Sequence, residues 1–133
     1  MKGSVPLLFL VLLVLATAIA IACGSSHTLQ SIAVNPATAD ANGEPVQFTA
    51  TGYYNNPPSP ITPQPATWGA CYQNMPTNNV SVSSTGLAQC ASGAAGTYTV
   101  FAYDLVGKAC PQWVGPCGGS GCSVTGTAQL TCP

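Results

Sequence analysis

Residues 97–103 read TYTVFAY, a stretch made of β-branched and aromatic residues with one alanine. Such side chains fit the pleated surface of a sheet, and they alternate between its two faces along a strand. Val100 and Ala102 therefore share one face, and Phe101 and Tyr103 share the other. The stretch predicts a strand with Val100 and Ala102 in the core. Phe101 and Tyr103 then form either an exposed patch or a surface covered by the long segment at 105–121.

Similar alternation before and after this strand predicts six further short strands. Fourteen glycines and 12 prolines interrupt the chain too often for long helices. We expect Trp68 to be a core aromatic, and turns around Asn42 and at 84–86. Seven strands at this spacing predict an all-β protein, an antiparallel sandwich. The six further strands are expected at residues 32–34, 46–51, 66–70, 80–82, 87–90 and 124–131.

Charge is scarce in this chain. Only five of its 133 residues are Lys, Asp or Glu, and Arg is absent. Neutralising the phosphates of nucleic acid requires clustered Lys and Arg, so nucleic-acid binding is excluded. A hydrophobic fraction of 47% also argues against disorder, which combines low hydrophobicity with high net charge. One folded domain is the expectation. The five charged residues are Lys2, Asp40, Glu44, Asp104 and Lys108.

The first 22 residues have the pattern of a signal peptide. Lys2 supplies a positive start, and residues 7–22 are apolar apart from Thr17. A retained membrane helix is less favoured, because residues 24–27 supply no charged flank that would stop transfer.

The end of this segment reads AIACG at residues 20–24. Small residues before a cysteine resemble the lipobox of bacterial lipoproteins. The resemblance implies that Cys23 becomes the amino terminus and carries a diacylglycerol, with acyl chains such as palmitate. Gly24 after the cysteine resembles the outer-membrane pattern of that family. Ala20 stands where the family more often has Leu, and the stretch also fits an ordinary A-x-A cleavage site. A secreted, unlipidated protein is therefore the alternative to a lipoprotein of the cell envelope, on the outer membrane or cell surface.

The cysteine count is odd, at seven. Lipidation of Cys23 leaves six cysteines, which can close three disulfides in an oxidising compartment. Alternating strand directions place three of them at one end of the sandwich and three in the long loop at the other, so one bridge must join the two groups. Among the 15 possible connectivities, we predict a Cys71–Cys90 bridge. The two groups are Cys71, Cys90 and Cys132, and Cys110, Cys117 and Cys122.

Several stretches occur in an order that resembles a bacterial immunoglobulin-like domain of group 2 (BIG2). They are IAVNP at 32–36, Gly43, VQFTATGY at 46–53, Trp68, VSVSSTGL at 80–87 and GTYTV at 96–100. The resemblance implies an immunoglobulin-like sandwich over residues 29–133, with residues 23–28 as lipidated cysteine and tether. It also implies an envelope module for adhesion, spacing, or binding of carbohydrate or protein. The Cys-bearing segment at 105–121 departs from the family pattern.

Catalysis is not expected, because acid-base side chains are few. The only histidine, His27, falls in the tether, and Asp40 and Glu44 flank an expected turn. Asp104 and Lys108 complete the set outside the signal peptide. The cysteines lack the Cys-x2-Cys spacing of zinc sites, so we expect no metal site and no cofactor.

Aromatic residues on loops give the one candidate binding surface. Tyr53 and Tyr54 precede five prolines within residues 57–65, and Trp113 lies in the last long loop. In an immunoglobulin-like sandwich these loops share one end, and the first strand starts there. The lipid would then hold these rings near the bilayer, where they contact headgroups or an envelope partner. Alternatively, they cap the core. The Cys90 and Cys132 end would point away from the membrane.

Overall fold

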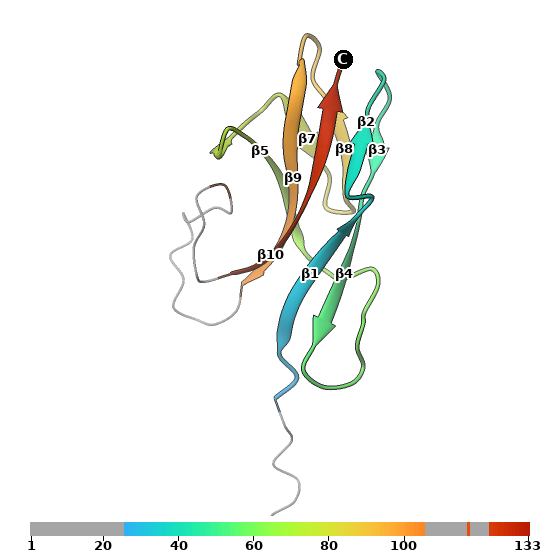
Figure 1. The fold of residues 1–133 in the computed structure, drawn as a ribbon, viewed down its shortest axis with the longest axis vertical. Helices are drawn as coiled ribbons and strands as arrows, with labels where there is room; N and C mark the ends of the chain where they lie inside the picture. Colours follow the sequence, from blue (N-terminus) through green and yellow to red (C-terminus); the bar gives the residue numbers. More distant parts are fainter. Residues whose placement is uncertain (1–25, 106–116, 118–122) are drawn as a thin grey trace, which may run out of the picture.

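The computed structural model describes residues 26–105, 117 and 123–133. These residues form ten strands, which confirms the all-β prediction (Figure 1). Seven were expected. The difference arises because the stretch at 46–51 is interrupted at Phe48, and because two very short strands, β2 and β6, show no alternation in the sequence. The strands are β1 (Leu29–Asn35), β2 (Thr38–Asp40), β3 (Val46–Gln47), β4 (Thr49–Tyr54), β5 (Thr67–Tyr72), β6 (Met75–Pro76), β7 (Val80–Val82), β8 (Leu87–Cys90), β9 (Gly96–Leu105) and β10 (Ser123–Cys132).

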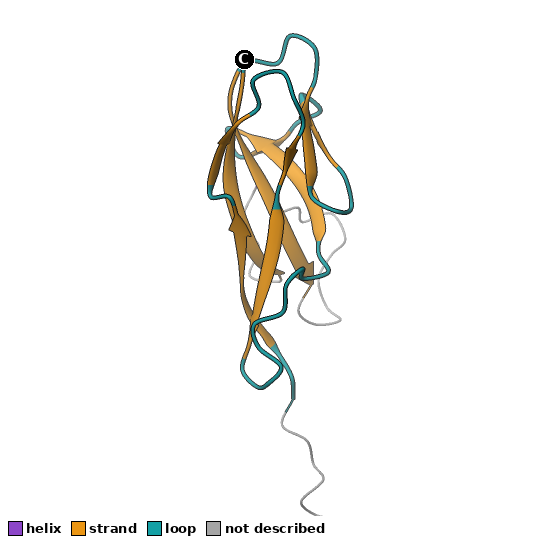
Figure 2. Cartoon of the chain, turned by 90° about the vertical axis from the view of Figure 1, so that its right-hand side faces the viewer, coloured by secondary structure: helices purple, strands orange, loops and turns teal. Residues whose placement is uncertain are grey.

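The strands pack as a β-sandwich of two layers (Figure 2). One layer is a five-stranded sheet in the order β2-β10-β9-β5-β6. The other contains the pair β1-β4 and the three-stranded sheet β3-β8-β7. Phe48 joins these two parts, since it links β3 to β4 and its backbone N–H donates to the Gly86 carbonyl at 2.9 Å. All strand pairs are antiparallel except β2 with β10.

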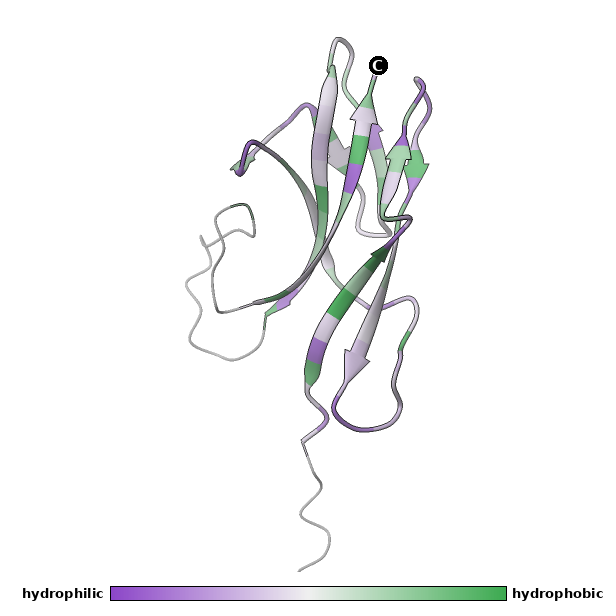
Figure 3. Ribbon diagram, viewed as in Figure 1, coloured by the Kyte–Doolittle hydropathy of each residue, from purple (hydrophilic) through white to green (hydrophobic). Residues whose placement is uncertain are grey.

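The core lies between the layers and follows the expected alternation. Buried residues alternate with more exposed ones from Ile32 to Asn35 in β1 and from Gly126 to Cys132 in β10. Figure 3 shows green hydrophobic bands along both strands. Phe48, Val100 and Leu130 are completely buried. Ile32 is buried as well, whereas Trp68 is half-buried and packs against the core from its edge.

The expected turns are confirmed at both positions. In the turn between β7 and β8, the Gly86 N–H donates to the Ser83 carbonyl at 3.0 Å, and Gly86 has φ of +85°. Between β2 and β3, Asn42 and Gly43 also have positive φ. Glycine adopts such angles at little cost and asparagine tolerates them better than most residues, so both turns carry residues suited to reversing the chain.

Within the described residues, two disulfides brace the sandwich. Cys90–Cys132 connects β8 to β10 and so joins the two layers. Cys71–Cys117 lies on the outer face of the five-stranded sheet, against Phe101. It connects one of the end cysteines to one of the loop cysteines, as expected. Cys110 and Cys122 lie outside the described residues.

The predicted Cys71–Cys90 bridge is wrong, and the reason is the direction of the Cys71 side chain. Ala70 pairs with Val100 in the core, so the next residue, Cys71, points to the opposite face of its sheet. Cys90 belongs to the other layer and packs against the core. A side chain on the outside of one sheet cannot reach across the core to the other layer.

The side chains around Cys71 also determine whether Phe101 and Tyr103 are exposed. Phe101 is buried together with Cys71 and Cys117, and Tyr103 packs against this cluster. The two rings have centroids 5.9 Å apart. Phe101 is therefore covered by the bridge to Cys117 rather than exposed.

Candidate functional site

The first described residues and the C-terminus lie at opposite ends of the long axis (Figure 1). The chain enters at the lower end in this view, beside the loop that follows β4. That loop spans residues 55–66 and carries the five prolines. The C-terminus and the Cys90–Cys132 bridge mark the other end. The sandwich thus has an entry end and a distal end.

At the entry end, the rings of His27 and Tyr54 form a stack. The imidazole of His27 lies on the ring of Tyr54, with centroids 4.1 Å apart and planes 8° from parallel. His27 Nε2 also forms a hydrogen bond with the Pro58 carbonyl at 3.1 Å. His27 is therefore part of a fixed contact between the incoming chain and the loop.

Asn55 fastens the incoming chain at three points. The Asn55 Oδ1 accepts from the Thr28 N–H at 2.8 Å, and the backbone N–H of Asn55 donates to the Thr28 carbonyl at 3.1 Å. Its Nδ2 donates to the Ser26 carbonyl at 2.9 Å. Asn56 Nδ2 adds a weaker bond to the same carbonyl, at 3.2 Å. Residues 26–28, expected to be part of a tether, are held against the domain. We call this set of contacts (His27 with Tyr54 and Pro58, and Asn55 with Ser26 and Thr28) the entry clamp.

Inside the loop, Gln64 is the one buried polar residue in the described part of the chain. Its Oε1 accepts from the Tyr54 hydroxyl at 2.8 Å, and its Nε2 donates to the Pro65 carbonyl at 3.2 Å. Gly52 leaves room for this side chain, because a Cβ there would collide with Gln64 Oε1. Tyr54 is thereby held twice, by Gln64 at its hydroxyl and by His27 at its ring.

The expected binding surface is only partly assembled by the structure. Tyr53 is exposed at the entry end, with 44% of its surface accessible. Tyr54 is half-buried and packs against the core, so it serves the entry clamp and the loop. Trp113 lies outside the described residues. The prediction that Tyr53 and Tyr54 lie where the chain enters the sandwich is confirmed by the bonds between Thr28 and Asn55.

A groove on the side of the sandwich was not expected from the sequence. It has a volume of about 230 Å³. It lies between the start of β4, the last part of the proline-rich loop and the β7–β8 turn, with Trp68 half-buried in its wall. We call it the Trp68 groove. Its lining residues are Thr49, Ala50, Pro63, Gln64, Pro65, Ala66, Trp68, Ser84 and Thr85.

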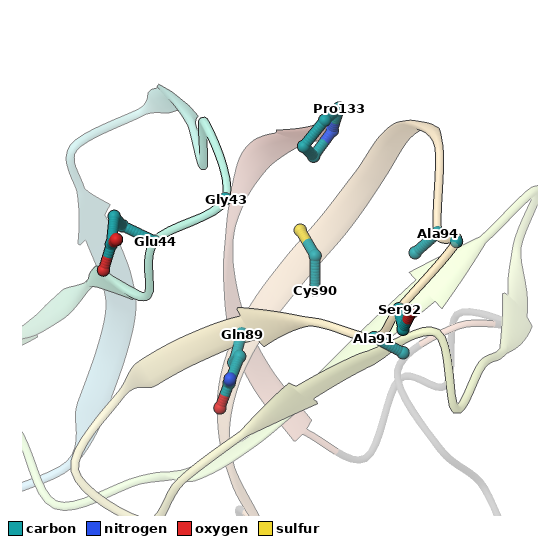
Figure 4. A pocket seen from close by; sticks show the side chains of 9 residues that line it. Gly43, Glu44, Gln89, Cys90, Ala91, Ser92, Ala94 and Pro133 are labelled. Atoms are coloured by element: carbon teal, nitrogen blue, oxygen red, sulfur yellow. The ribbon is translucent and has the colours of Figure 1, made fainter.

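The distal end holds a wider pocket of about 410 Å³, next to the Cys90–Cys132 bridge (Figure 4). Small residues make up most of its wall, and Glu44 is its only charged residue. Figure 4 shows the Gln89 side chain pointing away from Cys90 and Pro133. Its lining contains no aromatic ring against which a ligand could stack.

Acid-base side chains are spread over the described residues rather than gathered. His27 belongs to the entry end, and Glu44 lines the distal pocket. Within residues 26–105, 117 and 123–133, no three His, Cys, Asp or Glu side chains come close enough to hold a metal ion. In the same residues, no helix is long and apolar enough to cross a bilayer.

No protein-family model matches the chain, and no curated protein matches it.

Proposed function

We propose that this chain is a bacterial envelope lipoprotein, anchored through Cys23, that carries one immunoglobulin-like domain with a binding or structural role. The observation that carries the proposal is the entry clamp. It fixes Ser26, and only Gly24 and Ser25 separate Ser26 from Cys23. The three residue steps from Cys23 to Ser26 span at most about 11 Å. A lipid on Cys23 would therefore hold the entry end at the bilayer surface.

The strand order supports the immunoglobulin-like assignment. In an immunoglobulin sandwich, strands A, B, E and D form one sheet and C, F and G the other. The layer of β1, β3/β4, β8 and β7 matches the first set, and β5, β9 and β10 match the second. This agreement also supports the sequence resemblance to group 2 bacterial domains. The fold itself does not select a function.

The described acid-base groups favour a binding or structural module over an enzyme. A hydroxyl nucleophile requires a base within hydrogen-bond reach. His27 is engaged with Tyr54 and Pro58 at the entry end, whereas Glu44 belongs to the distal pocket.

Cys23→Ser tests the anchor in expressing bacteria. We expect the unchanged protein in the membrane pellet, with the intact mass of a diacylglycerol-modified chain, and the variant in the supernatant. A variant that stays in the pellet would favour a retained apolar helix. An unchanged protein that is already in the supernatant would favour the secreted, unlipidated module.

The orientation is tested separately with Trp113 as a fluorescent reporter, isolated by Trp68→Phe. The chain has only these two tryptophans. If the aromatic loops face the bilayer, Trp113 emission in the lipidated protein shifts in liposomes and responds to quenchers placed in the lipid. Emission that does neither contradicts the membrane-facing orientation, while leaving the anchor intact.

A further inference from the structure

The Trp68 groove combines an aromatic ring, proline surface and hydroxyl-bearing side chains, whereas the distal pocket has no aromatic residue in its lining. It exposes part of an indole ring, and prolines 63 and 65 contribute rigid apolar surface beside it. Hydroxyl-bearing residues form much of the remaining wall: Thr49, Ser84 and Thr85. No lining residue carries a charge.

The walls of the groove are held in place by contacts that do not involve a ligand. The Gln64 side chain is fixed by Tyr54 and Pro65. On the opposite side, the Thr85 hydroxyl bonds to Ser83 Oγ at 2.9 Å, and the Thr85 carbonyl accepts from Gln47 Nε2 at 2.7 Å. A pocket formed in advance loses less entropy when a ligand binds.

From this geometry we propose that the Trp68 groove binds one neutral sugar ring. A pyranose has an apolar C–H face and a rim of hydroxyls. Polarised C–H groups are attracted to the negative face of an indole. Hydroxyls of the sugar exchange hydrogen bonds with side chains such as Ser84, which is exposed at the groove and can both donate and accept.

Size and charge select this ligand class. Pockets for drug-sized ligands have volumes of about 300–1,000 Å³. At about 230 Å³, the groove suits a single ring. Because the lining offers no cation, an acidic sugar would lose hydration without gaining a charged partner. The proposal does not depend on lipidation, since the groove lies on the side of the sandwich.

The test uses Trp68 itself as the reporter. Trp113→Phe leaves Trp68 as the only tryptophan of the chain. We expect a saturable change in Trp68 emission when this variant is titrated with the methyl glycosides of glucose, mannose, galactose or N-acetylglucosamine. Titration up to about 100 mM covers a site with a millimolar Kd. The absence of a saturable change with all four sugars overturns the proposal.

Paired serine variants locate the bound sugar. In the Trp113→Phe background, Ser84→Ala removes a hydroxyl from the Trp68 groove, and Ser92→Ala removes one from the distal pocket. Loss of one hydrogen bond raises Kd about fivefold. We expect this increase for Ser84→Ala and an unchanged Kd for Ser92→Ala. Equal Kd values in the two variants overturn the proposal.

Two competing ligands complete the test. Glucuronate should bind less well than methyl glucoside, and a proline-rich peptide should not displace the sugar. Tighter binding of glucuronate means that the neutral lining does not govern binding and overturns the proposal. Displacement by the peptide identifies the groove as a site for polyproline segments, which also bind aromatic grooves, and overturns it as well.

Discussion

Single residues with positive φ decide how tightly the turns of this sandwich close. Gly86 has φ of +85°, and a Cβ at this position would also collide with the Phe48 carbonyl oxygen. Gly43 has nearly the same φ, +86°, but nothing lies within 4 Å of a Cβ there. A side chain at position 43 would therefore introduce backbone strain alone, whereas one at position 86 would add a steric collision.

We expect Gly43→Ala to lower the free energy of unfolding by about 1–2 kcal/mol, the cost of a left-handed non-glycine residue. Gly86→Ala should cost clearly more, because the Phe48 backbone carbonyl must also move, and that carbonyl lies where β3 and β4 join. Urea denaturation of both variants measures the difference. Equal losses would mean that the collision relaxes without cost.

The side-chain direction of single cysteines could have been read from the sequence. Cys132 lies two residues after Leu130 and four after Ala128 in the same strand, so it faces the core as they do. Cys71 directly follows the inward-facing Ala70 and therefore faces outward. These directions alone argue against Cys71–Cys90. The position of Cys117 was not predictable in this way, because it lies outside any strand and depends on the path of a long loop.

At the scale of strands, prediction was accurate where alternation extended over several residues. β1, β9 and β10 follow the expected pattern. β2 and β6 were not predicted, because strands of three and two residues are too short to show an alternating pattern. β2 is defined by its parallel pairing with β10. The Trp68 groove was likewise missed, because its walls come from three separate stretches of the chain.

The interlayer bridge should be the main covalent support of the distal end. Cys90–Cys132 closes a loop with a sequence separation of 42 residues. Chain-entropy estimates for loops of this size give roughly 4 kcal/mol, and measured values are typically 2–4 kcal/mol. We expect the double variant Cys90→Ala, Cys132→Ala to lose about that much stability in guanidinium denaturation. A loss below about 1 kcal/mol would show that β8 and β10 hold together without it.

The entry clamp determines whether the chain before β1 moves with the domain. Asn55→Ala removes the side-chain bonds to Thr28 and Ser26, whereas Asn56→Ala removes one weaker bond to Ser26. We expect the ¹⁵N order parameters of the Ser26 and His27 amides to fall below about 0.6 in Asn55→Ala, the range of flexible backbone. They should stay near those of the unchanged protein in Asn56→Ala. Similar values in both variants would mean that the stack of His27 on Tyr54 suffices.

The fold separates the entry end of the sandwich from its distal end. The entry clamp and Tyr53 lie at one end, and the C-terminus lies at the other. A lipid at Cys23 would fix the first end at the membrane and leave the distal pocket farthest from it. The Trp68 groove lies on the side of the sandwich, where a bilayer at the entry end does not cover it.

The two disulfides also overlap along the chain, since one spans residues 71–117 and the other 90–132. Every peptide bond between Cys71 and Cys132 is therefore enclosed by at least one of them. A protease that cuts once anywhere in this stretch leaves a single covalent molecule, and a cut between Cys90 and Cys117 leaves both fragments doubly linked. Briefly nicked protein should run as one band on a non-reducing gel and as two bands after reduction. A protein built in this way stays in one covalent piece after a first cleavage between Cys71 and Cys132.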